Sequence, residues 1–261
     1  MPAELKSTTQ GQTMVLTLSH PEQRNALGPS LYAAGVEALA GAETNPEVRS
    51  VVLTGEGAHF SAGGDLNRLL AQRQQPPQAQ ADSIDALHSW IEAVRTFPKP
   101  VIAAVEGAAA GAGFSLVLAC DLVVAASDAI FVMAYSNVAL SPDGGASWSL
   151  ARALPRQLTS ELLMCGQRIS AQRLHELGLV NRVCATGQAL SSALQLAEQI
   201  NTRAPNALAS IKELITEADQ QPLEAHLTSE RDHFVRNLHH PNGGEGISAF
   251  LQKRTPRFDS A

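Results

Sequence analysis

The chain has 261 residues, enough for one large domain with a full hydrophobic core. Apolar residues make up 44% and charged residues 17%, an ordinary globular composition. The formal net charge is −6 and Lys and Arg do not cluster, which argues against nucleic acid as a main partner. The longest apolar run, residues 101–124, is broken by polar residues and glycines, so no membrane span is expected. The first ten residues lack an apolar signal core, and we expect a cytoplasmic protein.

Strands and helices alternate along the first three-quarters of the chain. Strands are predicted at 14–18, 49–53, 59–60, 101–105, 122–125, 129–133 and 179–183. Helices are predicted at 29–40, 83–97, 114–119, 144–154, 159–165 and 170–177, and from 189 almost to the end. The polar segment 72–82 contains two prolines and is interpreted as a mobile surface loop. This alternation predicts an α/β layered fold followed by a helical tail.

Cysteines and histidines do not indicate a metal site. The three cysteines, Cys120, Cys165 and Cys184, are widely spaced and odd in number, so we expect buried structural thiols rather than disulfides or a zinc site. His233, His239 and His240 in the helical tail have no partner motif. No metal is therefore expected.

Two segments share one design that bears on chemistry. FSAGGDL (60–66) and EGAAAGAGFSL (106–116) each contain a turn of small residues after a predicted strand, and the second leads into a helix. Small residues let a ligand approach the backbone, and a free N–H at a helix start carries a positive partial charge. Two such N–H groups that meet at one point form an oxyanion hole, in which one donor contributes about 2.7–4 kcal/mol to the transition state. The alternative is that the glycines only permit close packing of helix and strand.

The order of motifs along the chain is more specific than either segment alone. It runs RNAL, FSAGGDL, KPVIAAVEGAAAGAG, ACD, SPDGG, RISAQRLHELGLV and finally FLQKRTPRF. This series resembles the enoyl-CoA hydratase/isomerase family, the crotonase superfamily, over nearly the whole chain. The resemblance implies an enzyme that binds an acyl-CoA thioester and stabilises its enolate.

The resemblance also implies an architecture. The family fold is a spiral of repeated ββα units, which would occupy residues 1–195 here. A helical C-terminal region, residues 196–261, would serve for trimer formation, so a homotrimer or a dimer of trimers is expected.

Six positions carry over as backbone donors or coenzyme A contacts. The oxyanion donors fall on the N–H groups of Gly64 and Ala112. Ala112 stands where many members have glycine, which the site should tolerate because the donor is a backbone group. The coenzyme A contacts fall on Arg24 and Lys253 for the phosphates and on the backbone of Ala26 and Ala62 for the adenine. Coenzyme A is part of the substrate, so no separate cofactor is expected.

The chain departs from the well-studied hydratases at the two glutamates that activate water. Ser115 stands at the first of these positions and Tyr135 at the second, and neither is a good general base at pH 7. The remaining carboxylate in this region is Asp143, where double-bond isomerases of the family place a catalytic Asp or Glu. The alternative role for Asp143, in a Pro-Asp-Gly turn before a helix, is an N-cap.

Other polar and aromatic residues have weaker assignments. Asp65 and Asp121 are expected to be structural, and Trp148 to pack under the site. His88 and Trp90 are candidates for the lining of the acyl pocket, although a core or surface position is the more ordinary one for such residues. Ser115 and Tyr135 remain candidates for substrate contact.

Four functions compete. The favoured one is double-bond isomerisation of an unsaturated acyl-CoA with Asp143 as acid and base, in fatty-acid or phenylacetate-like catabolism, because LSPDGG resembles ring-type acyl-CoA isomerases. The second is a hydratase that adds water without the glutamate pair. The third is an aryl-CoA dehalogenase or thioester hydrolase with Asp143 as nucleophile. The fourth is a protein that binds CoA esters or RNA without turnover.

Overall fold

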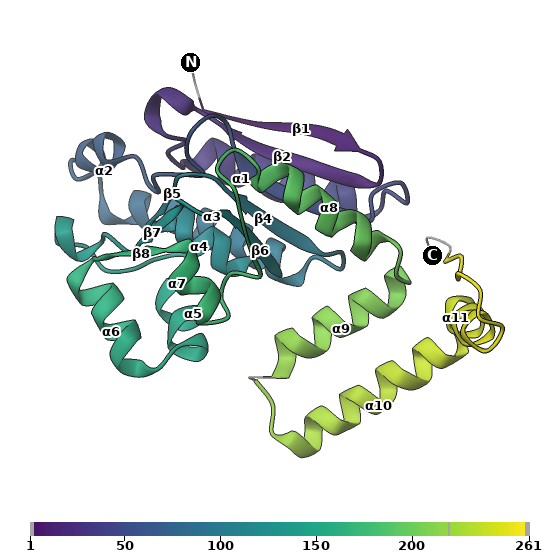
Figure 1. Ribbon diagram of the computed structural model, residues 1–261. Helices are drawn as coiled ribbons and strands as arrows, with labels where there is room; N and C mark the ends of the chain where they lie inside the picture. Colours follow the sequence, from purple (N-terminus) through teal and green to yellow (C-terminus); the bar gives the residue numbers. More distant parts are fainter. Residues whose placement is uncertain (1–2, 219, 259–261) are drawn as a thin grey trace.

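The computed structural model describes residues 3–218 and 220–258, and most of its strands form one sheet (Figure 1). The six-stranded sheet has the order β1-β2-β3-β4-β6-β9. Its strands are β1 (Glu4–Gln10), β2 (Thr13–Ser19), β3 (Ser50–Gly55), β4 (Val101–Val105), β6 (Leu122–Ala126) and β9 (Arg182–Cys184). Only β1 runs antiparallel to its neighbour, since a tight turn at Gly11 joins it to β2.

A smaller sheet holds the second strands of the repeated units. Its order is β5 (Ala108–Ala110), β7 (Ile130–Val132) and β8 (Arg168–Ser170). The pairs β4–β5 and β6–β7 each send one strand to the large sheet and the next to the small one, which is the crotonase arrangement expected from the motifs. The strand predicted at 59–60 is wrong. That segment contributes only an isolated bridge from Ser61 to Ala109, because the chain turns away at Gly63, where φ is +84°.

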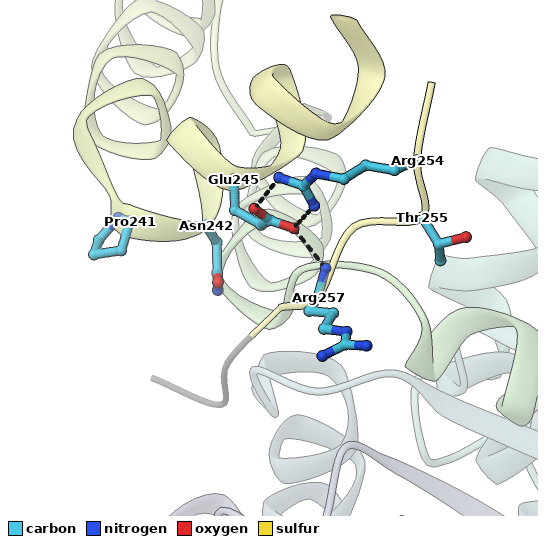
Figure 2. A pocket seen from close by; sticks show the side chains of 6 residues that line it. All are labelled: Pro241, Asn242, Glu245, Arg254, Thr255 and Arg257. Atoms are coloured by element: carbon cyan, nitrogen blue, oxygen red, sulfur yellow. Dashed lines mark hydrogen bonds and ion pairs between the residues drawn. The ribbon is translucent and has the colours of Figure 1, made fainter. Parts of the chain in front are cut away.

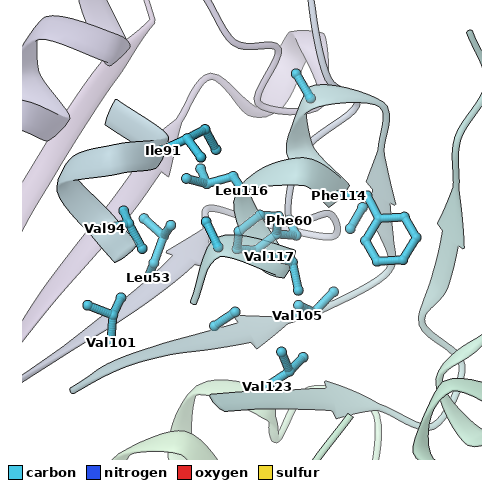
Figure 3. Packing of buried hydrophobic residues seen from close by; sticks show 14 of the residues in the cluster. Leu53, Phe60, Ile91, Val94, Val101, Val105, Phe114, Leu116, Val117 and Val123 are labelled. Carbon is cyan, nitrogen blue, oxygen red and sulfur yellow. The ribbon is translucent and has the colours of Figure 1, made fainter. Parts of the chain in front are cut away.

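Helices cover both faces of the large sheet. The helices of the core are α1 (Pro29–Glu43), α2 (Leu66–Gln72), α3 (Pro77–Thr96), α4 (Ala112–Ala119), α5 (Ala146–Ala153), α6 (Arg156–Cys165), α7 (Ala171–Glu176) and α8 (Ala189–Asn201). Alternate strand residues such as Leu53 and Val105 pack with α3 and α4 in the main core (Figure 3). The intervening residues, such as Val52, meet α8, whose Ala189, Ala193 and Ala197 form a stripe at a spacing of four. This alternation follows from the period of two along a strand.

Three helices extend beyond the sheet: α9 (Pro205–Ala218), α10 (Leu223–His239) and α11 (Pro241–Leu251) (Figure 1). Lys212 of α9 attaches them to the core by an ion pair of 2.7 Å with Asp121, whose carboxylate also accepts the N–H of Val101. Asp121 is thus structural, as expected. The division at residue 195 falls inside α8, which packs on the sheet, so the helices that leave the core begin at α9. The two-part domain division stays a prediction.

Two further expectations need correction. Most of the segment 72–82 is not a loop, because α3 already begins at Pro77; proline fits the first turn of a helix, where its missing N–H has no partner to lose. Cys165 is exposed rather than buried, while Cys120 and Cys184 are partly buried and all three thiols are free. No helix in the described ranges is long and apolar enough to cross a membrane.

Candidate active site

The two small-residue segments lie side by side. Ser61 donates its N–H to Ala108 O at 3.0 Å and accepts the N–H of Ala110 at 2.9 Å. A Cβ built on Gly63 would lie 2.5 Å from Ala110 O and 3.3 Å from Ala112 N. Glycine is therefore required at 63 both by its positive φ and by the close approach of the second segment.

The backbone N–H groups of Gly64 and Ala112 have no hydrogen-bond partner within the described residues. Ala112 is the first residue of α4, and Gly111 before it takes a φ of +49° that turns the chain into the helix. On the other side, Asp65 caps α2 by accepting the N–H groups of Asn67 and Arg68, as its structural assignment predicted. Two unpaired donors thus flank the contact between the segments, an arrangement able to bind one oxygen from both sides.

Asp143 is held by the two residues at the hydratase glutamate positions. Tyr135 donates its hydroxyl to Asp143 Oδ1 at 2.5 Å, and Ser115 Oγ donates to the backbone oxygen of Asp143 at 3.0 Å. The N-cap alternative for Asp143 is wrong, since the cap of α5 is Gly145 and no side chain caps that helix. The predicted residues Ser115, Tyr135 and Asp143 are therefore one hydrogen-bonded group, which motif matching alone did not reveal.

Burial controls the charge states in this group. The pKa of Asp143 is raised above its ordinary value mainly by burial, while the hydrogen bond from Tyr135 and the charge of His88 act in the opposite direction. The pKa of Tyr135 lies far above its ordinary value because of burial and the neighbouring Asp143. The tyrosine consequently remains a donor, and Asp143 keeps one oxygen free of Tyr135 for other contacts. A carboxylate with a raised pKa is a better base than an exposed one.

A model of the family described as "Enoyl-CoA hydratase/isomerase" matches residues 8–261. The chain belongs to the enoyl-CoA hydratase/isomerase family. It is 37% identical over 246 residues to a 1,2-epoxyphenylacetyl-CoA isomerase of Escherichia coli K12, covering 94% of each chain. It is 36% identical over 261 residues to a 2,3-dehydroadipyl-CoA hydratase of the same organism, covering 98% of each. Among solved structures, an enoyl-CoA hydratase from Polaromonas sp. JS666 has a TM-score of 0.97 at 71% identity, covering 97% of this chain and 99% of that one.

Within this enoyl-CoA hydratase/isomerase fold, three of the predicted coenzyme A contacts lie close to the first donor. Ala62 donates its N–H to Arg24 O at 2.8 Å, and Leu27 donates to Gly63 O at 2.7 Å, so the RNAL segment runs along FSAGG. Arg24 is exposed, whereas Ala26 is buried. The bend between them is fixed by the buried Asn25, whose amide donates to Glu56 O and His59 O.

The fourth predicted contact, Lys253, lies elsewhere in the chain. It follows α11, which Figure 1 shows on the opposite side of the molecule from α2 and α4. Glu245 accepts both Arg254 Nη groups, at 2.6 and 2.8 Å, and the N–H of Arg257 at 2.8 Å (Figure 2). These bonds lower the pKa of Glu245 to about 2, so the C-terminal segment stays anchored by a charged carboxylate at neutral pH. A single subunit does not bring Lys253 to the other predicted residues.

The three weaker assignments, for Trp148, Trp90 and His88, have different outcomes. Trp148 does not pack under the site; it is 36% exposed, and the guanidinium groups of Arg95 and Arg152 lie over its ring, 4.4 and 4.0 Å from the ring centroid. Trp90 is a core residue, 1% exposed. His88 is exposed on α3, and its charge acts on Asp143.

Proposed function

We propose that this family member isomerises the double bond of an unsaturated acyl-CoA. In this proposal the thioester oxygen lies between the N–H groups of Gly64 and Ala112, and Asp143 moves the proton. The observation that carries it is the hydrogen-bonded group of Asp143, Tyr135 and Ser115, in which one carboxylate occupies a site that lacks the two water-activating glutamates.

The chemistry balances with one acid–base residue. Asp143 takes a proton from C2 of a 3-enoyl thioester, and the electron pair moves onto the thioester oxygen, where the two N–H donors stabilise the dienolate. The protonated Asp143 then gives the proton to C4, the carbonyl re-forms, and the double bond lies between C2 and C3. Stabilisation of the oxygen by each donor contributes about 2.7–4 kcal/mol. General acid–base catalysis contributes about 10²–10⁴-fold.

Tyr135 and Ser115 act on Asp143 in this proposal rather than on the substrate. The tyrosine hydroxyl binds one carboxylate oxygen and leaves the other for the proton transfer, while Ser115 fixes the backbone of the segment that carries Asp143. Arg24, Ala26 and Ala62 bind the coenzyme A part. Lys253 reaches the phosphates from a neighbouring subunit of a trimer.

Water addition is the second candidate. It is favoured by the 36% identity to a protein named 2,3-dehydroadipyl-CoA hydratase. In that reaction Asp143 alone would activate the water.

The two reactions differ in mass and in absorbance. The purified protein is incubated with a 3-enoyl-CoA and, separately, with a 2-enoyl-CoA, and the products are followed by mass spectrometry and ultraviolet absorbance. Isomerisation converts the 3-enoyl ester into the conjugated ester at unchanged mass. Addition of one water to the 2-enoyl ester without any double-bond shift would make the chain a hydratase. A covalent adduct on Asp143 would indicate the nucleophilic route.

A further inference from the structure

A groove outside the active site separates α9 from the core. Its cavity volume is about 560 Å³, within the range of about 300–1,000 Å³ that is usual for small-molecule sites. The lining comes mainly from α9, from α5 and the last turn of α3, and from the turn between α4 and β6. Figure 1 shows α9 beyond α5, where the chain leaves the core. Gly64, Ala112 and Asp143 do not line this groove, so it is separate from the proposed reaction site.

Apolar side chains form most of the lining. Leu118 and Leu122 come from the turn between α4 and β6, and Leu208, Ile211 and Ile215 come from α9. Ile211 and Ile215 lie one helical turn apart and remain 53% and 70% exposed. Exposed aliphatic surface that gathers in a groove marks a binding site, because covering it removes apolar area from water. This part of the groove is therefore suited to an aliphatic chain.

The charged groups of the groove are mostly positive. Among the lining residues that the structure describes, Arg95, Arg152 and Lys212 stand against one carboxylate, that of Asp121, in a chain whose net charge is −6. Lys212 is neutralised by its ion pair with Asp121 at 2.7 Å, and its ammonium also donates to two backbone oxygens of the core, at 2.9 and 3.4 Å. Burial raises the pKa of the Cys120 thiol, so this lining residue adds no negative charge. The positive charge that is left in the groove is that of Arg95 and Arg152.

One aromatic ring holds both guanidinium groups. They lie over the indole of Trp148, 4.4 Å from its centroid for Arg95 and 4.0 Å for Arg152. Contact with a ring face uses none of the five N–H groups of a guanidinium, and two parallel N–H groups match the two oxygens of a carboxylate. Trp148 is exposed, and Ser149 adds a hydroxyl to the same part of the lining. The α5 side of the groove is therefore suited to an anionic head group.

We propose that this groove binds a long-chain aliphatic carboxylate, with its oxygens on Arg95 and Arg152 and its chain along α9. The guanidinium groups on one side and the apolar surface over the rest match the two ends of such a molecule. A second copy of this chain is the competing occupant. Phe250 and Leu251, the most exposed apolar side chains of α11, do not line the groove, which favours a small ligand here. The inference does not depend on which reaction the active site performs.

Tryptophan fluorescence reports on the groove directly. The chain has two tryptophans; Trp90 is 1% exposed in the core, whereas Trp148 lines the groove. Dodecanoate, titrated below its critical micelle concentration, should bind saturably and move the emission of Trp148 to shorter wavelength, because the ligand displaces water from the indole. The Trp148→Phe variant should lose this change in emission. Calorimetry on the same preparations measures the affinity.

Dodecanol, which has the same chain without the charge, tests the head group. Dodecanoate should bind about ten- to a hundredfold more tightly than dodecanol, the range for hydrogen bonds to a charged group. Arg152→Met should remove most of this preference and leave the binding of dodecanol unchanged. Arg156→Met is the matched control, because it removes the same charge from an exposed position at the start of α6, outside the groove. It should keep the preference.

The aliphatic end of the ligand has its own variant. Ile211→Ser should weaken the binding of dodecanoate and dodecanol alike, because both place their chains along α9. Met164→Ser, at an apolar position of α6 that is 75% exposed, should weaken neither.

Three results would overturn the inference. The first is equal binding of dodecanoate and dodecanol. The second is loss of dodecanoate binding in the presence of saturating hexanoyl-CoA, which would place the fatty acid in the active site. The third is absence of dodecanoate binding to the wild type; a smaller mass of Ile211→Ser by light scattering would then assign the groove to a second copy of the chain.

Discussion

Asp143 has lost most of its contact with water and has gained one hydroxyl donor in exchange. Burial favours the neutral acid, and the bond from Tyr135 favours the carboxylate, so the two effects oppose each other. Burial is the larger effect, which leaves the pKa of Asp143 above its ordinary value. The raised pKa makes this carboxylate a stronger base toward a thioester held by two N–H donors.

Replacing Tyr135 with Phe should move the pH dependence of the reaction. Without the donor the pKa of Asp143 rises further, so the acid limb of kcat/KM shifts to higher pH because the base form appears later. The kcat at high pH should also fall by about tenfold, since one carboxylate oxygen loses its hydrogen bond. Stopped assays of kcat/KM from pH 4 to 9 check both effects.

Ser136→Ala serves as the control, because it removes an exposed hydroxyl next to Tyr135 and should leave the pH profile unchanged. An acid limb in Tyr135→Phe at the wild-type position would show that the tyrosine does not act on the base.

At the scale of elements, the site depends on the contact between the FSAGG turn and the start of α4. Gly63→Ala would place a Cβ 2.5 Å from Ala110 O and would also force a residue with a side chain into a positive φ. The two N–H donors should move apart, and a displacement of about 1 Å costs about 10²-fold in rate. We expect kcat to fall far more than the affinity for coenzyme A. Steady-state kinetics measure the first quantity, and calorimetry with CoA measures the second.

Gly41→Ala is the control for that substitution. It lies in α1 with nothing within 4 Å of its Cβ position, and alanine favours a helix. Its activity should match the wild type. A Gly63→Ala variant that folds with full kcat would contradict the placement of the donors.

Particular elements show what the sequence could and could not predict. Motif order identified the family, and it predicted the two donors and Asp143, because those residues occur in contiguous patterns. It missed β1, since ELKSTTQ is almost wholly exposed and is held only by its backbone pairing with β2. It missed α2, whose Leu66 and Leu70 are exposed and give no buried face to recognise. The bond from Tyr135 to Asp143 depends on how a loop closes, which no local pattern encodes.

At the scale of the whole molecule, helices α9 to α11 expose large apolar side chains. Phe234, Phe250 and Leu251 are 69%, 83% and 75% exposed. Surfaces of this kind mark protein interfaces. We predict that light scattering will show a trimer or a dimer of trimers. The Phe250→Asp variant should contain more of the smaller species, because a charge replaces an apolar side chain of the interface.

The same variant tests whether a neighbour supplies Lys253. Loss of the oligomer should raise KM for a CoA ester, whereas KM for the matching N-acetylcysteamine thioester, which lacks the phosphates, should not change. A monomeric wild-type protein with an ordinary KM for CoA esters would refute this arrangement.

The most direct measurement is turnover of a 3-enoyl-CoA by Asp143→Asn, with calorimetry of CoA-ester binding on the same preparation. The amide keeps the size of the side chain and can still bond to Tyr135, but it cannot take a proton. Asp143 as the acid–base residue predicts a loss of about 10²–10⁴-fold in double-bond shift with binding retained. Wild-type turnover in the variant would contradict the central claim.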